Sequence, residues 1–158
     1  MRFRPLVLLI AAPLWAGAPL KVTVETATYQ SGPGREPPPG KPPFEPRILA
    51  QVALRGLGPG AVPEFRLWRM PEAEAKALRR GQPVRKGRPG LQRVEGFTSV
   101  LGPGTYRIQA PVGSAWNPGE SLVVEVFLRG RWRGRGMAPL LEANLPRQDP
   151  PGREEMKP

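Results

Sequence analysis

The chain has 158 residues, with no histidine, no cysteine and a single aspartate, Asp149. These three residue types supply most general bases, thiolate nucleophiles and transition-metal ligands, so their scarcity argues against an enzyme and against a metal or other cofactor. The 24 Lys and Arg residues outnumber the 13 Asp and Glu residues and give a formal net charge of +11. Arginine favours planar anionic partners, so the excess indicates an acidic partner; the compositional bias of a GC-rich, heat-adapted genome is the other explanation.

Residues 1–18 have the pattern of an export signal. Two arginines precede a short apolar core at residues 5–16, and small residues follow up to Ala18. The core is shorter than the roughly 18–20 residues that span a bilayer. Cleavage after Ala18 would leave Pro19 first, which is poorly accepted, so cleavage after Ala16 and retention as a membrane anchor both stay open. We expect export to the periplasm, the cell envelope or the medium.

The remaining chain is long enough for one domain of ordinary size, which we expect over residues 19–142. Within it, residues 30–46 are rich in proline and predict a stiff, extended connector. Residues 143–158 are proline-rich and charged, and predict a disordered tail. Without cysteine the domain has no disulfide, so packing and hydrogen bonds must stabilise it.

Alternation of apolar and polar residues predicts strands along most of the domain. The expected strands cover residues 20–29, 48–55, 62–70, part of 91–101, 105–110 and 122–128. Proline presets the first corner of a type II turn and glycine accepts the positive φ of the second. Such turns are expected at Pro59-Gly60, Pro89-Gly90, Pro103-Gly104 and Pro118-Gly119.

Residues 71–80, reading PEAEAKALRR, depart from this pattern and predict one short helix between strands. Proline stands at the first helical position, acidic residues follow in the first turn, and Gly81 comes after two arginines. Glu72 and Lys76 are spaced for a favourable i,i+4 ion pair.

The turn and strand at residues 101–108, reading LGPGTYRI, resemble the corner before the penultimate strand of Ig-like and fibronectin-III-like domains. Tyr106 matches the tyrosine that bonds back to the preceding backbone there. Residues 65–71, followed by a helical insert, resemble macroglobulin-type sandwich domains of exported bacterial proteins. The resemblance spans about residues 62–128 and implies an all-β, Ig-like antiparallel β-sandwich with one inserted helix, acting as a binding or spacer module. The cysteine pair of antibody-type domains is missing, and no thioester or protease-bait motif is present, so no trapping activity is implied.

The most distinctive local sequence is LRGRWRGRGM at residues 128–137. We expect a hairpin with a three-residue loop, Arg129 to Arg131, in which Leu128 lies opposite Trp132 on the inside, and Phe127 opposite Arg133 and Glu125 opposite Arg135 on the outside. Arg129, Arg131 and Arg133 are then candidate contacts for phosphate, an acidic polysaccharide or an acidic protein. The alternative is an edge hairpin whose charges only discourage aggregation. Arg-Gly runs with an aromatic residue also bind single-stranded nucleic acid, a partner that we do not expect here.

Trp116, in the loop at residues 111–120, is the second candidate for binding, because loops at sandwich ends often carry recognition and tryptophan is a frequent anchor. The alternative is that Trp116 caps the end of the core. The remaining candidates for catalysis are Glu95, Glu120 and Glu125, which in principle could serve a glycosidase; solvated or ion-paired roles fit their positions better. We therefore expect a non-catalytic binding or structural module that contacts an envelope protein or an anionic polymer, and that contacts the membrane only if the leader is retained.

Overall fold

The computed structural model describes residues 20–31, 39–40, 45–85, 92–113 and 115–143. The export signal at residues 1–18, most of the connector at 30–46, and the tail at 143–158 apart from Ala143 lie outside the described residues, as does the Pro89-Gly90 turn. The described residues form nine strands and one helix. In chain order these are β1 (Lys21–Gln30), β2 (Arg47–Arg55), β3 (Pro63–Pro71), α1 (Glu72–Lys76), β4 (Gln92–Val94), β5 (Phe97–Gly102), β6 (Thr105–Pro111), β7 (Glu120–Leu128), β8 (Arg131–Pro139) and β9 (Leu141–Glu142).

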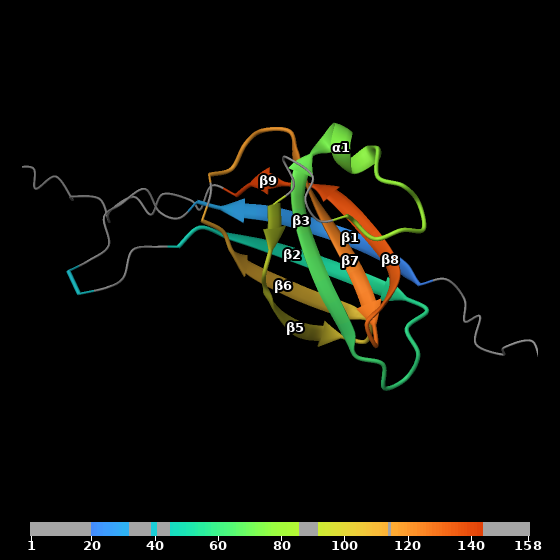
Figure 1. Cartoon of the computed structure of the whole chain (residues 1–158). Coiled ribbons are helices and arrows are strands. Elements are labelled where there is room, and N and C mark those ends of the chain that lie inside the picture. Colours follow the sequence, from blue (N-terminus) through green and yellow to red (C-terminus); the bar gives the residue numbers. More distant parts are fainter. Residues whose placement is uncertain (1–19, 32–38, 41–44, 86–91, 114, 144–158) are drawn as a thin grey trace, which may run out of the picture.

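The strands form two sheets that pack face to face (Figure 1). One sheet has the order β5-β6-β2-β1-β9 and the other β4-β3-β7-β8. Neighbouring strands are antiparallel, except that β9 runs parallel to β1 over two residue pairs. The chain is therefore an all-β sandwich with one short helix, as the sequence pattern predicted.

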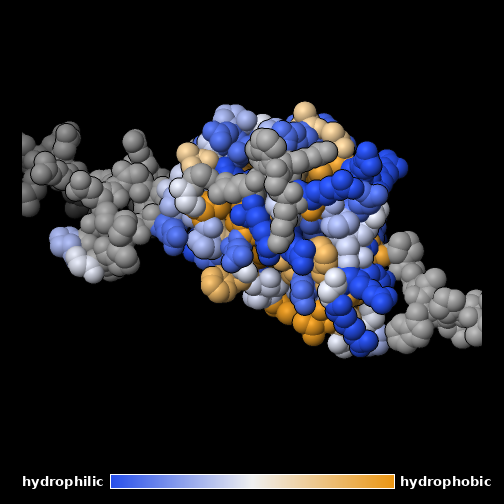
Figure 2. Space-filling view, viewed as in Figure 1, coloured by the Kyte–Doolittle hydropathy of each residue, from blue (hydrophilic) through white to orange (hydrophobic). Residues whose placement is uncertain are grey.

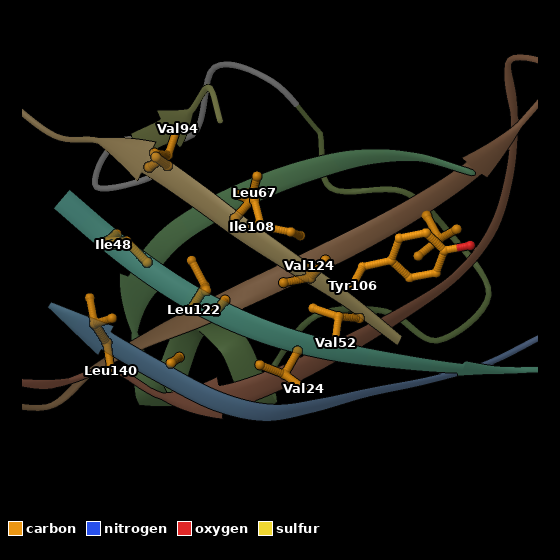
Figure 3. Packing of buried hydrophobic residues seen from close by; sticks show 14 of the residues in the cluster. Val24, Ile48, Val52, Leu67, Val94, Tyr106, Ile108, Leu122, Val124 and Leu140 are labelled. Carbon is orange, nitrogen blue, oxygen red and sulfur yellow. The ribbon is translucent and has the colours of Figure 1, made fainter. Parts of the chain in front are cut away.

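The predicted alternation appears directly in the burial of the five-stranded sheet, where every second residue of β2 and β6 is buried. These side chains meet those of β3, β4 and β7 between the sheets (Figure 3). Because a strand turns successive side chains to opposite faces, one buried face per strand is enough to fill this core. The figure labels its main members: Val24, Ile48, Val52, Leu67, Val94, Tyr106, Ile108, Leu122, Val124 and Leu140.

The central strand β7 is different, because all residues from Ser121 to Phe127 are buried. Its inner face packs in the main core, and its outer face packs under α1 and the segment after it. Trp68, Met70, Ala75, Val84 and Val123 form this second, smaller core. The outer face of the four-stranded sheet is thus partly covered and does not face water throughout.

The helix is shorter than predicted, ending at Lys76 and not at residue 80. Its start differs from the prediction by one residue: Pro71 is the N-cap, with extended backbone (ψ of 144°), and the helix begins at Glu72. Glu72 and Lys76 form the predicted i,i+4 ion pair. The cause of the shortening is a contact with a strand that is distant in the sequence. The carbonyl groups of Leu78 and Arg79 accept hydrogen bonds from the Arg135 guanidinium on β8, so this stretch lies along the sheet and does not continue the helix.

One predicted strand at residues 91–101 is in fact two strands that belong to different sheets. β4 pairs with β3, and β5 pairs with β6, with only Glu95 and Gly96 between them. A Cβ atom on Gly96 would lie 2.9 Å from the Gln109 carbonyl oxygen and 3.1 Å from Ala110 Cβ. Glycine is therefore needed where the chain crosses from one sheet to the other.

The opposite side of the sandwich is closed by contact between β8 and β1. A Cβ atom on Gly134 would lie 2.9 Å from the Leu20 carbonyl oxygen, and one on Gly136 would lie 2.8 Å from that of Val22. The two glycines let the edge strand of one sheet lie directly on the edge region of the other. The core is therefore covered on the side where β8 and β1 meet. On the side of β4 and β5, the described residues provide no comparable contact between the two sheets.

The predicted Pro-Gly turns that the structure describes have the expected backbone: Gly60, Gly104 and Gly119 all have positive φ, between 70° and 80°. The corner bond that the resemblance implied for Tyr106 is not formed within the described residues. Its hydroxyl makes no hydrogen bond there, and its ring packs against Phe65 with 5.2 Å between ring centroids. Tyr106 is a core residue that joins the two sheets.

Candidate functional site: the arginine hairpin

The β7–β8 hairpin, here called the arginine hairpin (residues 120–139), has a two-residue turn where the sequence predicted three residues. Leu128 pairs with Arg131, and Arg129 and Gly130 form the turn with φ of 50° and 73°. Positive φ at both positions is the signature of a type I′ turn, whose twist matches that of the flanking strands. Gly130 in the second position is the favoured residue, which explains why the loop is one residue shorter than expected.

The shorter turn changes the register near the tip. Glu125 lies opposite Arg135, as predicted, but Phe127 lies opposite Trp132 and not Arg133. A bulge between these pairs leaves Arg133 as the extra residue of β8. A bulge re-aims the neighbouring side chains. The predicted inward pairing of Leu128 with Trp132 is wrong for the same reason.

The predicted binding arginines lie at the tip with graded exposure. Arg129 and Arg131 are exposed, and Arg133 is half-buried. On the neighbouring strand β3, the Arg66 guanidinium lies over the Phe127 ring, 3.9 Å from its centroid. This cation–π contact covers Phe127. Because β3 pairs with β7, it also places a fourth guanidinium, that of Arg66, beside the arginine hairpin.

Glu125, which the sequence analysis placed on an outward face in a solvated or ion-paired role, is buried with 1% of its surface exposed. Its carboxylate accepts hydrogen bonds from the indole N–H of Trp68 at 2.9 Å, that of Trp132 at 3.2 Å and the backbone N–H of Val84 at 2.7 Å. A carboxylate with this many donors is a satisfied structural group and not a free base. The sequence held one indication of this buried role, a tryptophan on each strand next to β7. The strand register places Trp68 and Trp132 on the two sides of Glu125.

Arg135 completes this arrangement. Its guanidinium donates to the carbonyl groups of Leu78, Arg79 and Gln82 and so holds the segment after α1 against the sheet. Burial lowers the pKa of Arg135, and the neighbouring Glu125 carboxylate opposes that shift. The hollow beside Arg135 has a volume of about 90 Å³. Pockets for small organic ligands measure roughly 300–1,000 Å³, so this hollow is too small to hold such a ligand.

Trp116 lies far from the arginine tip. Trp116 precedes β7 and the hairpin turn follows it, so the length of this nine-residue strand lies between them. A strand of this length spans about 26 Å. Its side chain is half-buried against the main core, and its indole N–H donates to the Leu140 carbonyl at 3.0 Å. The structure therefore does not bring the tentative binding residues together into one site: the arginines form one surface and Trp116 belongs to the other end of the sandwich.

The three glutamates considered for catalysis are also separated by the fold. Glu120 accepts from Arg69, a guanidinium buried in the same end of the core, while Glu125 points to the outer face. Their side chains lie on opposite faces of one sheet, so they cannot flank a single glycosidic bond. Glu95 is exposed between β4 and β5. In the described part of the chain, no group of three or more His, Cys, Asp or Glu residues is arranged to hold a metal ion.

Among the described helices, none is long and apolar enough to cross a membrane. Comparison of the chain with models of known protein families, with curated proteins and with solved structures finds no significant match. Of the candidate binding residues, Arg129 and Arg131 are exposed at the tip of the arginine hairpin.

Proposed function

We propose that this protein is a non-catalytic binding module that contacts an acidic partner at the cell envelope through the tip of the arginine hairpin. The observation that carries the proposal is the backbone of Arg129, which has a φ of 50°. Asn and Gly adopt this conformation with less strain than arginine. An exposed arginine in a strained turn position is the kind of outlier found at functional sites.

Two further features support an electrostatic contact. Arg131 is exposed beside Arg129, and Arg133 and Arg66 lie near the same end of the sheet. The hairpin is anchored below by Glu125 and Arg135, so its guanidinium groups project from a rigid base. Rigid presentation lowers the conformational entropy lost on binding.

The partner that these features favour is an acidic face of an envelope protein; a polyanion such as an acidic polysaccharide is the alternative. Nucleic acid has less support, because binding of a single strand needs free aromatic faces for stacking. Phe127 is covered by Arg66, and the indole of Trp132 is held by Glu125. The end loop with Trp116 would be a second, separate contact.

The test compares two double variants of equal charge. In Arg129→Ser/Arg131→Ser the hairpin tip loses two charges, and in the control Arg79→Ser/Arg80→Ser two exposed arginines after α1 are lost. Retention on a heparin column and capture of proteins from an envelope extract are measured from about 50 to 500 mM salt. We expect the tip variant alone to lose binding and to show a flatter salt dependence. Equal loss in both variants would mean that only net charge matters and would contradict the proposal.

We also propose export and an Ig-like topology. Export is supported by the pattern of residues 1–18, and mass spectrometry of the amino terminus of the protein from its native cells tests it. The Ig-like assignment is supported by the two packed sheets and by the chain crossing between them at Gly96. An experimental structure that does not superimpose on Ig-like domains over both sheets would refute it.

A further inference from the structure

The edge strand β5 exposes apolar side chains that the sandwich leaves uncovered. Phe97 is 79% exposed, Val100 70% and Leu101 44%. Figure 2 shows hydrophobic residues along the lower margin of the molecule, where β5 lies in Figure 1. Phe97 lies opposite the exposed Gln109 on the outer face of the sheet, and Val100 lies opposite the buried Tyr106 on the inner face. Both faces of this edge strand therefore expose an apolar side chain, as is typical of a contact surface.

The exposure has a structural cause. Thr98 and Val100 lie opposite Ile108 and Tyr106 of β6 and share their core-facing side of the sheet. Ile108 and Tyr106 are buried, but Thr98 and Val100 are exposed, because the facing sheet ends in the three-residue strand β4. The inner face of β5 therefore extends beyond the cover that the described residues provide.

The strand also lacks the usual protection of a sheet edge. Natural edge strands carry lysine, other charges or proline that prevent pairing with another chain. β5 reads FTSVLG and has neither charge nor proline; its one irregularity is a bulge between Val100 and Gly102. On the opposite side of the sandwich, β8 and β1 cover each other, so the unprotected edge is confined to one side of the described molecule.

We propose that β5 pairs with β5 of a second copy of this chain, antiparallel and centred on Ser99. In this register Ser99 meets Ser99, Thr98 meets Val100, and Phe97 meets Leu101 of the other copy. Each pair combines polar with polar, β-branched with β-branched, or aromatic with aliphatic residues, which are favourable cross-strand neighbours. The backbone groups of the edge form the ladder, and the two five-stranded sheets join into one.

The charge distribution favours a second copy over an acidic partner strand. The chain carries a net charge of +11, yet the only charged residue from Val94 to Tyr106 is Glu95. An acidic strand would find no cation on β5 itself, whereas two basic copies meet there over uncharged strands, with Arg107 of each copy one strand away from the seam. β5 and the arginine hairpin belong to different sheets, so the proposed pairing uses none of the hairpin's residues.

A contact built on one six-residue strand is smaller than the roughly 1,200–2,000 Å² of stable complexes. We therefore expect a weak, concentration-dependent dimer, monomeric at about 1 μM and substantially dimeric at about 0.5 mM. Sedimentation velocity of the full chain over this range measures it. Val100→Lys places a charge on the edge and removes the dimer, whereas Leu141→Lys, at another exposed apolar residue on β9, leaves it intact.

The absence of native cysteine permits a sharper test of the register. In an antiparallel pair, opposite residues have Cα atoms about 4.5–5.5 Å apart, within the range that a disulfide bridges. We expect Ser99→Cys to form a disulfide-linked dimer on mild oxidation at least tenfold faster than Gln109→Cys. Gln109 is exposed on the next strand inward, beside Phe97, and its equivalent in the second copy is beyond reach.

The outcomes separate this proposal from the binding function. A chain that stays monomeric at about 0.5 mM, or a Ser99→Cys variant that crosslinks no faster than Gln109→Cys, overturns the dimer and leaves the hairpin untouched. A dimer that still forms in the Val100→Lys variant would assign the contact to another surface and would also overturn the β5 proposal. Loss of heparin binding in the hairpin variant, by contrast, has no bearing on the β5 edge.

Discussion

Glu125 is the residue on which the outer face of the four-stranded sheet depends. Its carboxylate joins two tryptophans from strands on either side with the backbone of Val84, and it faces the guanidinium that holds the segment after α1. A single side chain thus connects the helix segment, β3 and the arginine hairpin. Any change there affects three elements at once.

We predict that Glu125→Ala lowers the free energy of unfolding by about 3 kcal/mol or more, because the buried N–H donors of Trp68 and Val84 and the part-buried indole N–H of Trp132 lose their acceptor. Urea unfolding followed by tryptophan fluorescence measures this change, and Trp68 and Trp132 report it directly. Glu142→Ala, at an exposed glutamate on β9, is the control and should change stability by less than about 0.5 kcal/mol. Equal stability of the Glu125→Ala variant and the native chain would show that this carboxylate is not the anchor.

Arg129 offers a second prediction at the same scale. Arg129→Asn replaces a residue strained at a φ of 50° by one that tolerates it and should raise the free energy of unfolding by about 0.5–1 kcal/mol. The same variant should bind heparin more weakly, because the tip loses a charge. A combined measurement by thermal unfolding and affinity chromatography tests whether stability and binding move in opposite directions. If Arg129→Asn is less stable than the native chain, the backbone of Arg129 is not strained.

At the scale of elements, the sequence predicted what depends on alternation and end signals. The strands with one buried face, such as β2 and β6, and the presence of a short helix directly after Pro71 follow from local rules. What it could not predict depends on partners distant in the chain. The outer face of β7 is buried only because α1 and Val84 cover it, and α1 ends early because Arg135 takes the carbonyl groups beyond it.

The division of residues 91–101 into two strands was hidden for a related reason. Nothing in the alternation of β4 and β5 reveals that they belong to different sheets, because Gly96 carries the crossing through a close contact with Gln109 and Ala110 of β6. Likewise, the candidate site was predicted as a set of arginines, but their register depended on a bulge and a turn one residue shorter than assumed. Local sequence predicted which arginines lie near the hairpin turn, and tertiary contacts determined their geometry.

The close contact between β8 and β1 leads to a prediction for this pair of elements. Gly136→Ala places a Cβ atom 2.8 Å from the Val22 carbonyl oxygen and should lower the free energy of unfolding by about 1–3 kcal/mol. Gly58→Ala, in a loop where the new Cβ meets nothing within 4 Å, is the matched control. It should be neutral or stabilising by up to about 1 kcal/mol. Urea unfolding of both variants measures the two changes in the free energy of unfolding. A neutral Gly136→Ala would mean that β8 and β1 can move apart to admit the new Cβ atom.

At the scale of the whole molecule, charge is nearly independent of pH near neutrality. The chain has no histidine and no cysteine, and its positive charge comes mainly from arginine, which keeps its proton well above neutral pH. We predict that retention on heparin at fixed salt is unchanged between about pH 6 and 8, while it falls steeply with salt. Chromatography at matched ionic strength measures this. A strong pH dependence in that range would mean that the ligand, and not the protein, titrates.

The crossing of the chain at Gly96 has a consequence for how the molecule comes apart. Because β4 and β5 are one short stretch of backbone shared by both sheets, neither sheet can peel away while the other stays whole. The backbone itself links the two sheets at this point, so we expect all-or-none unfolding although no disulfide joins them. A domain without cysteine should thereby resist proteases until it unfolds as a whole, because cleavage needs a locally unfolded segment.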